Sequence, residues 1–415
     1  TAVGRNALDA NTTAANNTAV GYASLGANTT GTGNSALGTS SLPACTTGDY
    51  NVAIGYQSQR LTTTADDNTG LGAYTLYDNT TGTANVAVGF SALANNTTAN
   101  NNTAVGKDAL LANTTGTAGT AVGKGALQSN VNGTDNTGLG CLALSATTSG
   151  SNNVAVGRSA LQNQTTGESN VAVGYNAALS ITTGTENVAV GMAALDNSDV
   201  GSENTAIGKS ALGNDTKGSR NTAVGNSALQ TQNFTSATNS YNTAMGFSAG
   251  TAVTTGTNNT LMGGLCGDAI TTGNYNVAYG VSALSANTTA HSNGAFGFKA
   301  LFANTTGANN NAFGDSALRA NTTGNENTAF GNNAGTAITT GVGHVVVGMD
   351  ALKVCTTGTY NTAIGRQALI GDTTGTGNTA VGNGALSGIT TGSYNTGIGY
   401  NPQTTSATVN GQFVL

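Results

Sequence analysis

A glycine recurs every seventeen residues along this 415-residue chain, and no other feature constrains the fold as strongly. It closes a phrase close to Asn-Thr-Ala-Val-Gly, first at Gly4 and last at Gly399, in 24 copies. One interval, from Gly225 to Gly246, is longer by four residues. A fixed period of this length predicts a solenoid with one coil per repeat, in which each coil touches mainly its neighbours. We therefore expect an all-β fold, a parallel β-solenoid or β-roll of about 24 coils.

The period also predicts the domain organisation. It runs through residues 1–399, which we expect to form one repetitive shaft, and leaves residues 400–415 as a C-terminal cap or transition segment. Coils that stack as parallel strands are about 4.8 Å apart, so the shaft would be about 115 Å long.

Composition excludes several classes of function. Charged residues make up 7% of the chain and aromatic residues 5%, so it can build only a thin core that is renewed in every coil. The net charge is −6 and the 12 Lys and Arg residues are scattered, which argues against nucleic-acid binding. No apolar run is long enough to insert into a membrane.

The four cysteines lie in coils that are far apart: Cys45, Cys141, Cys266 and Cys355. The closest pair is separated by five coils, or about 24 Å along the axis. A disulfide requires Cα atoms within about 7 Å, so we expect four unpaired, semi-buried thiols.

The residues before each glycine predict the faces of a short strand. With the glycine as position 0, position −1 is always apolar, −2 is small in 22 copies, and +4 is usually Leu. We expect the residues at −1 and the Leu at +4 to face the interior of the coil. Position −2 then faces outward, and its small size predicts close packing against another copy of the chain. This is the basis for predicting a homotrimer.

Asparagines define two further columns, at −4 and in the corner Asn-Thr-Thr-Gly at +7 to +10. Stacked asparagines can form amide ladders along the axis, and Asn, Thr and Gly favour turns. The corners are also N-glycosylation sequons, for example Asn28, Asn113 and Asn304, which would carry glycans only in a secreting eukaryote.

Two departures from the repeat raise alternatives. Position −1 is aromatic in four consecutive coils, at Tyr279, Phe296, Phe313 and Phe330, which predicts a stack in the core; the alternative is a buried ligand site. His344 occupies a −4 position, where we expect it to replace Asn. If that position faced a threefold axis, three imidazoles could instead bind a metal ion.

The chain lacks the residues of a catalytic site. Its two histidines, His291 and His344, are three coils apart, and most acidic residues are isolated. Neither a Ser-His-Asp nor a Cys-His arrangement can be assembled from them, so we expect no enzyme activity and no cofactor.

The four-residue insertion lies within residues 230–241. Insertions in solenoids emerge as loops on one face and often bind ligands, so the candidate binding residues are Gln232, Phe234 and Tyr241. The alternative is a tolerated bulge. Aromatic residues at +1 could stack on sugars or pack over the corner: Tyr22, Tyr56, Phe90, Tyr175, Phe247 and Phe298.

The phrases at residues 51–55 (Asn-Val-Ala-Ile-Gly) and 361–365 (Asn-Thr-Ala-Ile-Gly) resemble the head repeats of YadA-like trimeric autotransporter adhesins. The full unit is similar to repeats in tail fibres of marine and cyanobacterial phages, and residues 406–415 resemble the segment that follows the last repeat in such fibres. The resemblance implies a left-handed parallel β-roll with three chains wound around one axis.

These observations favour a structural fibre protein, the rigid trimeric shaft of a phage tail fibre or similar extracellular virion appendage. Its partners would be two further copies of itself, other fibre or baseplate proteins, and a host cell-surface glycan or protein. The alternative is a trimeric adhesin on a bacterial surface. Ice binding is disfavoured because the paired corner threonines, such as Thr114 and Thr115, are adjacent and point to opposite sides.

Overall fold

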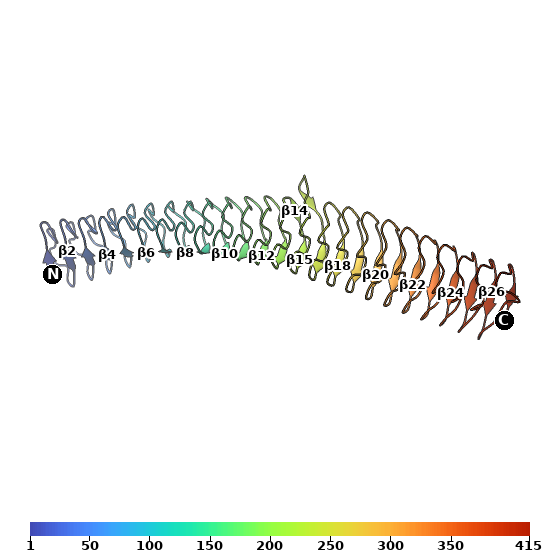
Figure 1. Cartoon of the computed structure of the whole chain (residues 1–415). Coiled ribbons are helices and arrows are strands. Elements are labelled where there is room, and N and C mark those ends of the chain that lie inside the picture. The colour runs from blue at the N-terminus through green and yellow to red at the C-terminus, as the bar shows by residue number, and fades with distance from the viewer. The chain divides into compact units, whose positions relative to one another are not determined.

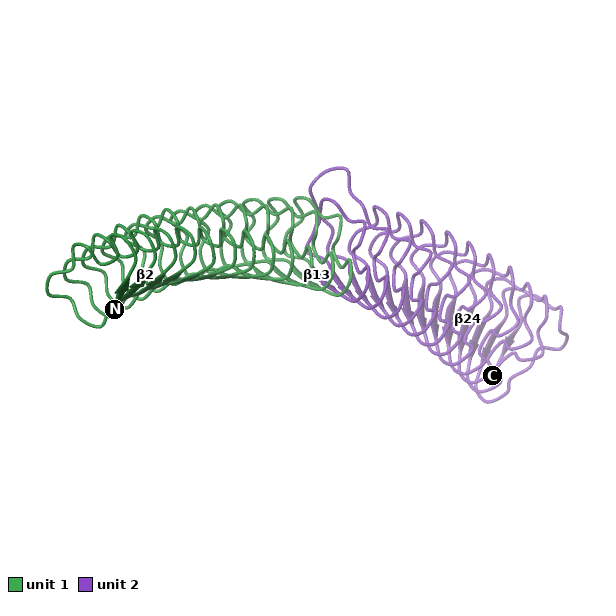
Figure 2. Cartoon of the chain, turned by 60° about the vertical axis from the view of Figure 1, so that its left-hand side comes forward, with its two compact units in different colours: residues 1–204 green, residues 205–415 purple.

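The structure is a computed structural model that describes all 415 residues, and it contains parallel β-strands and no helix. Each repeat forms one coil, in which a three-residue strand comes directly before the glycine and the rest is turn (Figure 1). The all-β parallel solenoid of about 24 coils is thereby confirmed. The chain divides into two compact units, residues 1–204 and 205–415, each described by itself below (Figure 2).

In the first unit twelve strands pair in parallel and in chain order. Partners are seventeen residues apart, as in Val154 and Val171, so the repeat sets the register. The strands are β1 (Ala2–Val3), β2 (Thr18–Val20), β3 (Ser35–Leu37), β4 (Val52–Ile54), β5 (Thr69–Leu71), β6 (Val86–Val88), β7 (Thr103–Val105), β8 (Thr120–Val122), β9 (Thr137–Leu139), β10 (Val154–Val156), β11 (Val171–Val173) and β12 (Val188–Val190).

The second unit repeats this arrangement and accommodates the insertion. Strand β15 pairs with β17 at an offset of 21 residues (Thr222 with Thr243). The segment that holds the extra residues contributes β16, which pairs in parallel with β14 of the preceding coil outside the main stack. The strands are β13 (Thr205–Ile207), β14 (Gly218–Ser219), β15 (Thr222–Val224), β16 (Thr238–Asn239), β17 (Thr243–Met245), β18 (Thr260–Met262), β19 (Val277–Tyr279), β20 (Gly294–Phe296), β21 (Asn311–Phe313), β22 (Thr328–Phe330), β23 (Val345–Val347), β24 (Thr362–Ile364), β25 (Thr379–Val381), β26 (Thr396–Ile398) and β27 (Phe413–Val414).

The structure reverses the expected faces of the strand. In β10, Ala155 at −2 is fully buried, whereas Val154 and Val156 are only half-buried. The same pattern recurs in nearly every strand, so −2 points into the coil and −3 and −1 point out. The prediction that −1 faces the interior was wrong. The coil is so thin that the leucine and asparagine columns opposite the strand leave room for little more than a methyl group.

The leucines at +4 do lie in the core, as expected, but in an unusual backbone conformation. Leu161 is fully buried and has a φ of 51°, in the left-handed region. That conformation costs a non-glycine residue about 1–2 kcal/mol. Burying a leucine side chain contributes about 1.5–3 kcal/mol, which is enough to offset the cost. The tight turn that directs this side chain inward is therefore sustained by the burial itself.

The glycine that sets the period is required on two grounds. At Gly174, φ is +140°, a conformation that residues with a Cβ rarely adopt. A Cβ there would also lie 2.5 Å from the carbonyl oxygen of Gly191 in the next coil. The glycine is thus the point where successive coils approach most closely.

Two buried amide ladders join the coils. In the −4 ladder, Asn34 donates through Nδ2 to the carbonyl of Gly48 (2.7 Å) and accepts through Oδ1 from the backbone amide of Asn51 (2.9 Å). In the +7 ladder, Asn113 Nδ2 donates to Asn96 Oδ1 (2.9 Å) and to the carbonyl of Gly116 (3.0 Å). The predicted ladders are confirmed, and both lie inside the coil.

The C-terminal segment continues the path of the coil. Strand β27 pairs with β26 at the usual offset (Thr396 with Phe413), and the Gln412 amide donates to Asn395 Oδ1 (2.9 Å). The four cysteines are unpaired, as expected; Cys141 is exposed and the other three are buried. Burial raises the pKa of the Cys45 thiol to about 11, so this residue serves as a small apolar side chain.

The core residues compensate for one another in volume. Leu261 is one of two large residues at −2, and the +4 positions on either side of it are Gly250 and Gly267 instead of Leu. A Cβ at Gly250 or Gly267 would lie 2.7 or 2.8 Å from the Leu261 side chain. The second case is Val346, which follows a coil with Gly335 at +4 and Ile338 at +7. A Cβ at Gly335 would lie 2.8 Å from Ile338 Cδ1.

We expect Gly335→Leu, which introduces the residue common at +4, to destabilise the protein by about 1–3 kcal/mol through overpacking. The triple variant Gly335→Leu, Ile338→Asn, Val346→Ala restores the usual set at all three positions and should recover most of the loss. Chemical denaturation monitored by circular dichroism measures both. Equal stability of the single and triple variants would contradict this account of the core.

Candidate functional site

The outward side of the strands forms an uncharged face in each unit, with an apolar column at −1 and mostly threonine or valine at −3. We call the −3 and −1 side chains of the strands the outer face. Position −1 is Val, Ile, Leu, Met or an aromatic residue throughout, −3 is Thr in 14 of 24 coils and Val in seven, and neither position carries a charge. Leu37 is 49% exposed and Phe330 58% exposed. Such a long uncharged apolar surface is the mark of an interaction site.

Four aromatic rings stack on this face in the second unit. The ring centroids of Tyr279 and Phe296 are 5.4 Å apart, those of Phe296 and Phe313 4.5 Å, and those of Phe313 and Phe330 5.7 Å. The rings of Phe296 and Phe313 are inclined by only 4°. The predicted stack is present, but the prediction that it lies in the core was wrong, because the side chains at −1 face outward.

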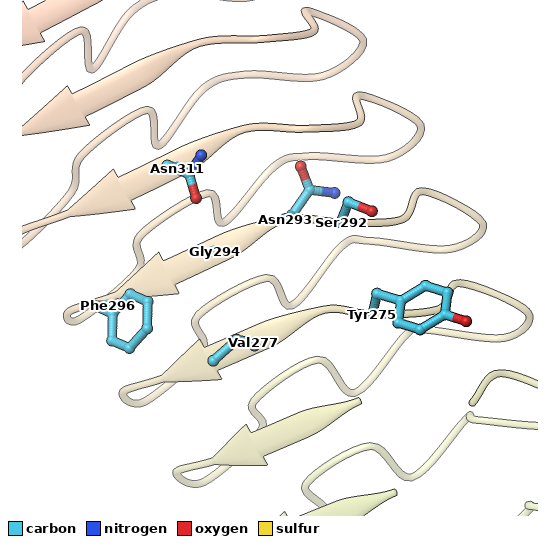
Figure 3. A pocket seen from close by; sticks show the side chains of 7 residues that line it. All are labelled: Tyr275, Val277, Ser292, Asn293, Gly294, Phe296 and Asn311. Atoms are coloured by element: carbon cyan, nitrogen blue, oxygen red, sulfur yellow. The ribbon is translucent and has the colours of Figure 1, made fainter. Parts of the chain in front are cut away.

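A notch interrupts the outer face beside the stack (Figure 3). It has a volume of about 300 Å³. Gly294 at −3 forms its floor, and the lining is completed by Tyr275, Val277, Ser292, Asn293, Phe296 and Asn311. The strand register places Val277 and Asn311 on either side of Gly294. Gly294 itself is buried, and Asn311 Oδ1 lies 2.8 Å from the place that a Cβ of Gly294 would take.

A second hollow, of about 470 Å³, lies over the turn that follows the +4 leucines of the same unit. Its lining is Phe302, Ala303, Arg319, Ala320, Thr336 and Ala337. Phe302 also lies near the Lys299 ammonium, 5.5 Å from its ring centroid.

The insertion holds two of its three predicted binding side chains inside the protein. Gln232 is fully buried, donates to Asp215 Oδ2 (2.7 Å) and accepts from Asn242 Nδ2 (2.8 Å). Phe234 is 6% exposed. Gln232 stands in the +7 column and joins it to the −4 ladder at Asn242, which makes it a structural residue of the bulge.

Tyr241 is the one exposed member of the predicted set. Its hydroxyl accepts a hydrogen bond from the Arg220 guanidinium (2.8 Å), whose carbon lies 5.7 Å from the ring centroid. Thr235, Ser236 and Ala237 of the insertion are exposed. A loop beside β14 stands out from the coils in Figure 1. The structure thus does not bring Gln232, Phe234 and Tyr241 together into one binding surface.

The aromatic residues at +1 are about half-exposed and partly packed. Phe90 is 49% exposed and makes an edge contact with Tyr74 (5.6 Å between centroids). Arg158 lies 5.9 Å from the ring centroid of Tyr175. These rings are spread over many coils, so they do not form one stacking platform.

His344 takes over the hydrogen bonds of the asparagine that it replaces. Nε2 lies 2.7 Å from the Gly358 carbonyl, and Nδ1 accepts from the Asn361 amide (3.2 Å). The ring is fully buried inside its own coil, which rules out the alternative of three imidazoles meeting on an axis outside the chain. Desolvation lowers the pKa of His344, so the neutral ring with its proton on Nε2 is the stable form.

Two aspartates replace asparagine in the +7 column. Burial raises the pKa of Asp372 to about 6, although the Gly375 amide donates to its Oδ1 (2.7 Å). Burial likewise raises the pKa of Asp215 to about 6. No group of three or more His, Cys, Asp or Glu side chains is placed to hold a metal ion.

The corner residues do not offer the chemistry that the sequence suggested. The sequon residues Asn28, Asn113 and Asn304 are fully buried, so a row of glycans at these asparagines is incompatible with the fold. Thr114 Oγ1 donates to the Val131 carbonyl of the next coil (3.1 Å), whereas Thr115 is exposed. The exposed threonine rank at the corners is therefore one residue wide.

Sequence reasoning missed the outer face and the notch, although a signal was present. At −2, Leu261 and Val346 coincide with Gly at neighbouring +4 positions, which indicates that −2 shares the core with the leucines.

Comparison with protein-family models and with curated proteins finds no match to this chain. The structure has no helix of the length and apolarity that a membrane span requires.

We expect His344→Asn to alter the pH dependence of stability. The folded-state pKa is below the unfolded value of 6.5, so the native state loses stability as the pH falls below about 6.5. The variant should match the parent at pH 8 and exceed it by up to about 2 kcal/mol at pH 5. Denaturant titrations at both pH values measure this, with exposed His291→Asn as the control. A parallel decline in parent and variant would refute it.

Asp372→Asn should have the opposite pH profile. The folded-state pKa of about 6 exceeds the ordinary 3.8, so ionisation destabilises the native state fully above pH 6 and not at all below 3.8. The variant should gain about 1–3 kcal/mol at pH 8 and nothing at pH 3.5. Exposed Asp315→Asn serves as the control. A gain that is the same at both pH values would argue against the burial of a charge as its cause.

Proposed function

We propose that the protein is a structural fibre protein, the trimeric shaft of a phage tail fibre or similar virion appendage. The observation that carries this proposal is the outer face, a parallel sheet surface that is uncharged and carries a column of exposed or half-buried apolar side chains at −1 in both units. The small residues at −2, which first suggested association, are explained by the chain's own core. The reason to propose association is instead the outward-facing apolar residues at −1.

The area of the outer face suits a stable interface. Twelve strands, spaced about 4.8 Å apart and about 10 Å wide, give roughly 570 Å² in each unit. That is close to the largest apolar patch of a typical monomer. Association would remove this surface from water.

The regular coil suits a shaft that spaces one protein from another. Successive coils are hydrogen-bonded through the strands, in most coils through the −4 ladder and the corner threonines, and in some also through the +7 ladder, which favours stiffness along the axis. Its partners would be two further copies, fibre or baseplate proteins, and a host cell-surface glycan or protein. The virion location rests on the resemblance of the repeat to phage fibres.

Charge on the outer face should prevent association without unfolding the coil. Val173 at −1 of β11 is 37% exposed, and Val173→Lys would place an ammonium group in the interface. Light scattering should report three chains for the parent and one for the variant, with unchanged circular dichroism. The control is Thr166→Lys on the exposed corner of the same unit. A monomeric parent at micromolar concentration would overturn the trimer.

The proposed location on a virus particle can be tested separately. Antibodies against the protein, used in electron microscopy, should label appendages of virus particles. Labelling of bacterial cell surfaces in the absence of virus would instead identify the protein as an adhesin.

A further inference from the structure

Tyrosine recurs at position −5, in the corner that comes before each strand. The residue at −5 has a φ in the left-handed region in all 23 coils that contain it, a conformation that suits Asn, Asp and Gly and is uncommon for a bulky side chain. Asn, Asp and Gly fill ten of these positions. Five others are tyrosines: Tyr50, Tyr241, Tyr275, Tyr360 and Tyr394.

Two of these tyrosines form a pair in the second unit. Tyr360 and Tyr394 are 64% and 70% exposed, so burial does not offset the cost of their backbone conformation as it does for the +4 leucines. They occupy the same position in coils that are two apart, which places both on one side of the solenoid, about 10 Å from each other. A conformation that costs stability at an exposed place points to a role in binding.

Glycine makes room for each of the two rings. The −5 residue of the preceding coil is Gly343 for Tyr360 and Gly377 for Tyr394. A Cβ at Gly343 would lie 2.6 Å from Tyr360 Cδ1, and a Cβ at Gly377 would lie 2.8 Å from Tyr394 Cδ1. A larger residue would displace the ring, so the glycines hold both rings against the corner. This alternation of Gly, Tyr, Gly and Tyr in successive coils occurs once in the chain.

The surroundings of the two rings are polar and uncharged. The adjacent position −6 carries the half-buried hydroxyls of Thr359, Thr376 and Ser393. The Ser393 hydroxyl accepts a hydrogen bond from the Thr376 amide (3.0 Å), which leaves its own proton for a ligand. Neither the corners at residues 356–361 and 390–395 nor the corner between them contains a charged residue. An anionic ligand would require cations here, and a protein partner would require an apolar centre.

We propose that Tyr360 and Tyr394 form a binding site for a neutral oligosaccharide, with one sugar ring stacked on each tyrosine and sugar hydroxyls bound by the hydroxyls at −6. A sugar ring has an apolar face of C–H groups and a rim of hydroxyls, which matches an aromatic ring beside a row of hydroxyls. The proposal rests on the proposed function for the class of partner, a host cell-surface glycan, and requires neither the trimer nor the virion.

Two rings at a fixed spacing select a chain of sugars over a single sugar. Stacking of one sugar on one exposed ring is weak, but a second sugar of the same chain then meets the second ring at a high effective concentration. The spacing is constant because β24, β25 and β26, which follow these corners, pair in register. Affinity should therefore rise steeply from a monosaccharide to an oligosaccharide that spans about 10 Å.

The test uses an array of neutral and acidic oligosaccharides, followed by titration calorimetry with the neutral oligosaccharide that binds best. Tyr360→Asn and Tyr394→Asn should each weaken that binding by about tenfold, because each removes one stacking ring. Tyr360→Phe keeps the ring and should keep most of the affinity. The matched control is Tyr50→Asn, which replaces a tyrosine that also lies over a glycine, Gly33, but has no second tyrosine two coils away; it should change nothing.

Thermal unfolding of the same variants distinguishes binding from a role in packing. Asn suits the left-handed conformation and occupies −5 in five other coils, so Tyr360→Asn and Tyr394→Asn should unfold at the temperature of the parent or above it. If the rings served only to cover the glycines, both variants would unfold at a lower temperature and no oligosaccharide would distinguish them from the parent.

The outcomes separate this site from the proposed shaft. If the parent binds no neutral oligosaccharide, or binds it as tightly as both Asn variants do, the site is wrong and the trimer is unaffected. If binding depends on both rings in a parent that light scattering finds monomeric, the site stands and the trimer fails. Preferential binding of acidic oligosaccharides would also overturn the site as a receptor for neutral sugars.

Discussion

Every feature of this protein depends on the hydrogen bonds that bind each coil to the next. The asparagine at −4 is central: Asn34 reaches across to the Gly48 carbonyl and accepts the backbone amide of Asn51, so one buried side chain ties together three segments of two coils. Buried polar groups are costly when unpaired, and a coil with so little apolar volume cannot tolerate many of them. In the ladder these polar groups are paired with the next coil, and their hydrogen bonds help to set the register between successive coils.

The narrow interior that the ladders leave explains the choice of core residues. Between the −4 and +7 asparagines there is space for one leucine, in a left-handed conformation, and for a methyl group at −2. Where −2 is larger, as at Leu261, the leucines on both sides become glycine. His344 survives in the ladder because its two nitrogens reproduce the amide's acceptor and donor. The core therefore behaves as a fixed volume that residues share across coils.

With alanine committed to the core, the larger apolar residues are left on the outside. That placement puts the aromatic residues at −1 on the outer face. Phe296 therefore stacks on the outside of the coil, beside the notch at Gly294. The insertion was expected to expose its side chains, but Gln232 and Phe234 are buried. Gln232 accepts a hydrogen bond from Asn242 of the −4 ladder.

The sequence by itself determined the period, the parallel solenoid, the inward leucines, the ladders and the unpaired cysteines. The first four follow from a residue type that repeats at a position where only one environment suits it, and the unpaired cysteines follow from the distance between their coils. Which face of each strand points into the coil was decided by the tertiary structure. A three-residue strand such as Val154–Val156 is apolar on both faces, so its alternation does not distinguish inside from outside. Only the thickness of the folded coil does so, because its interior admits the alanine and excludes the valines.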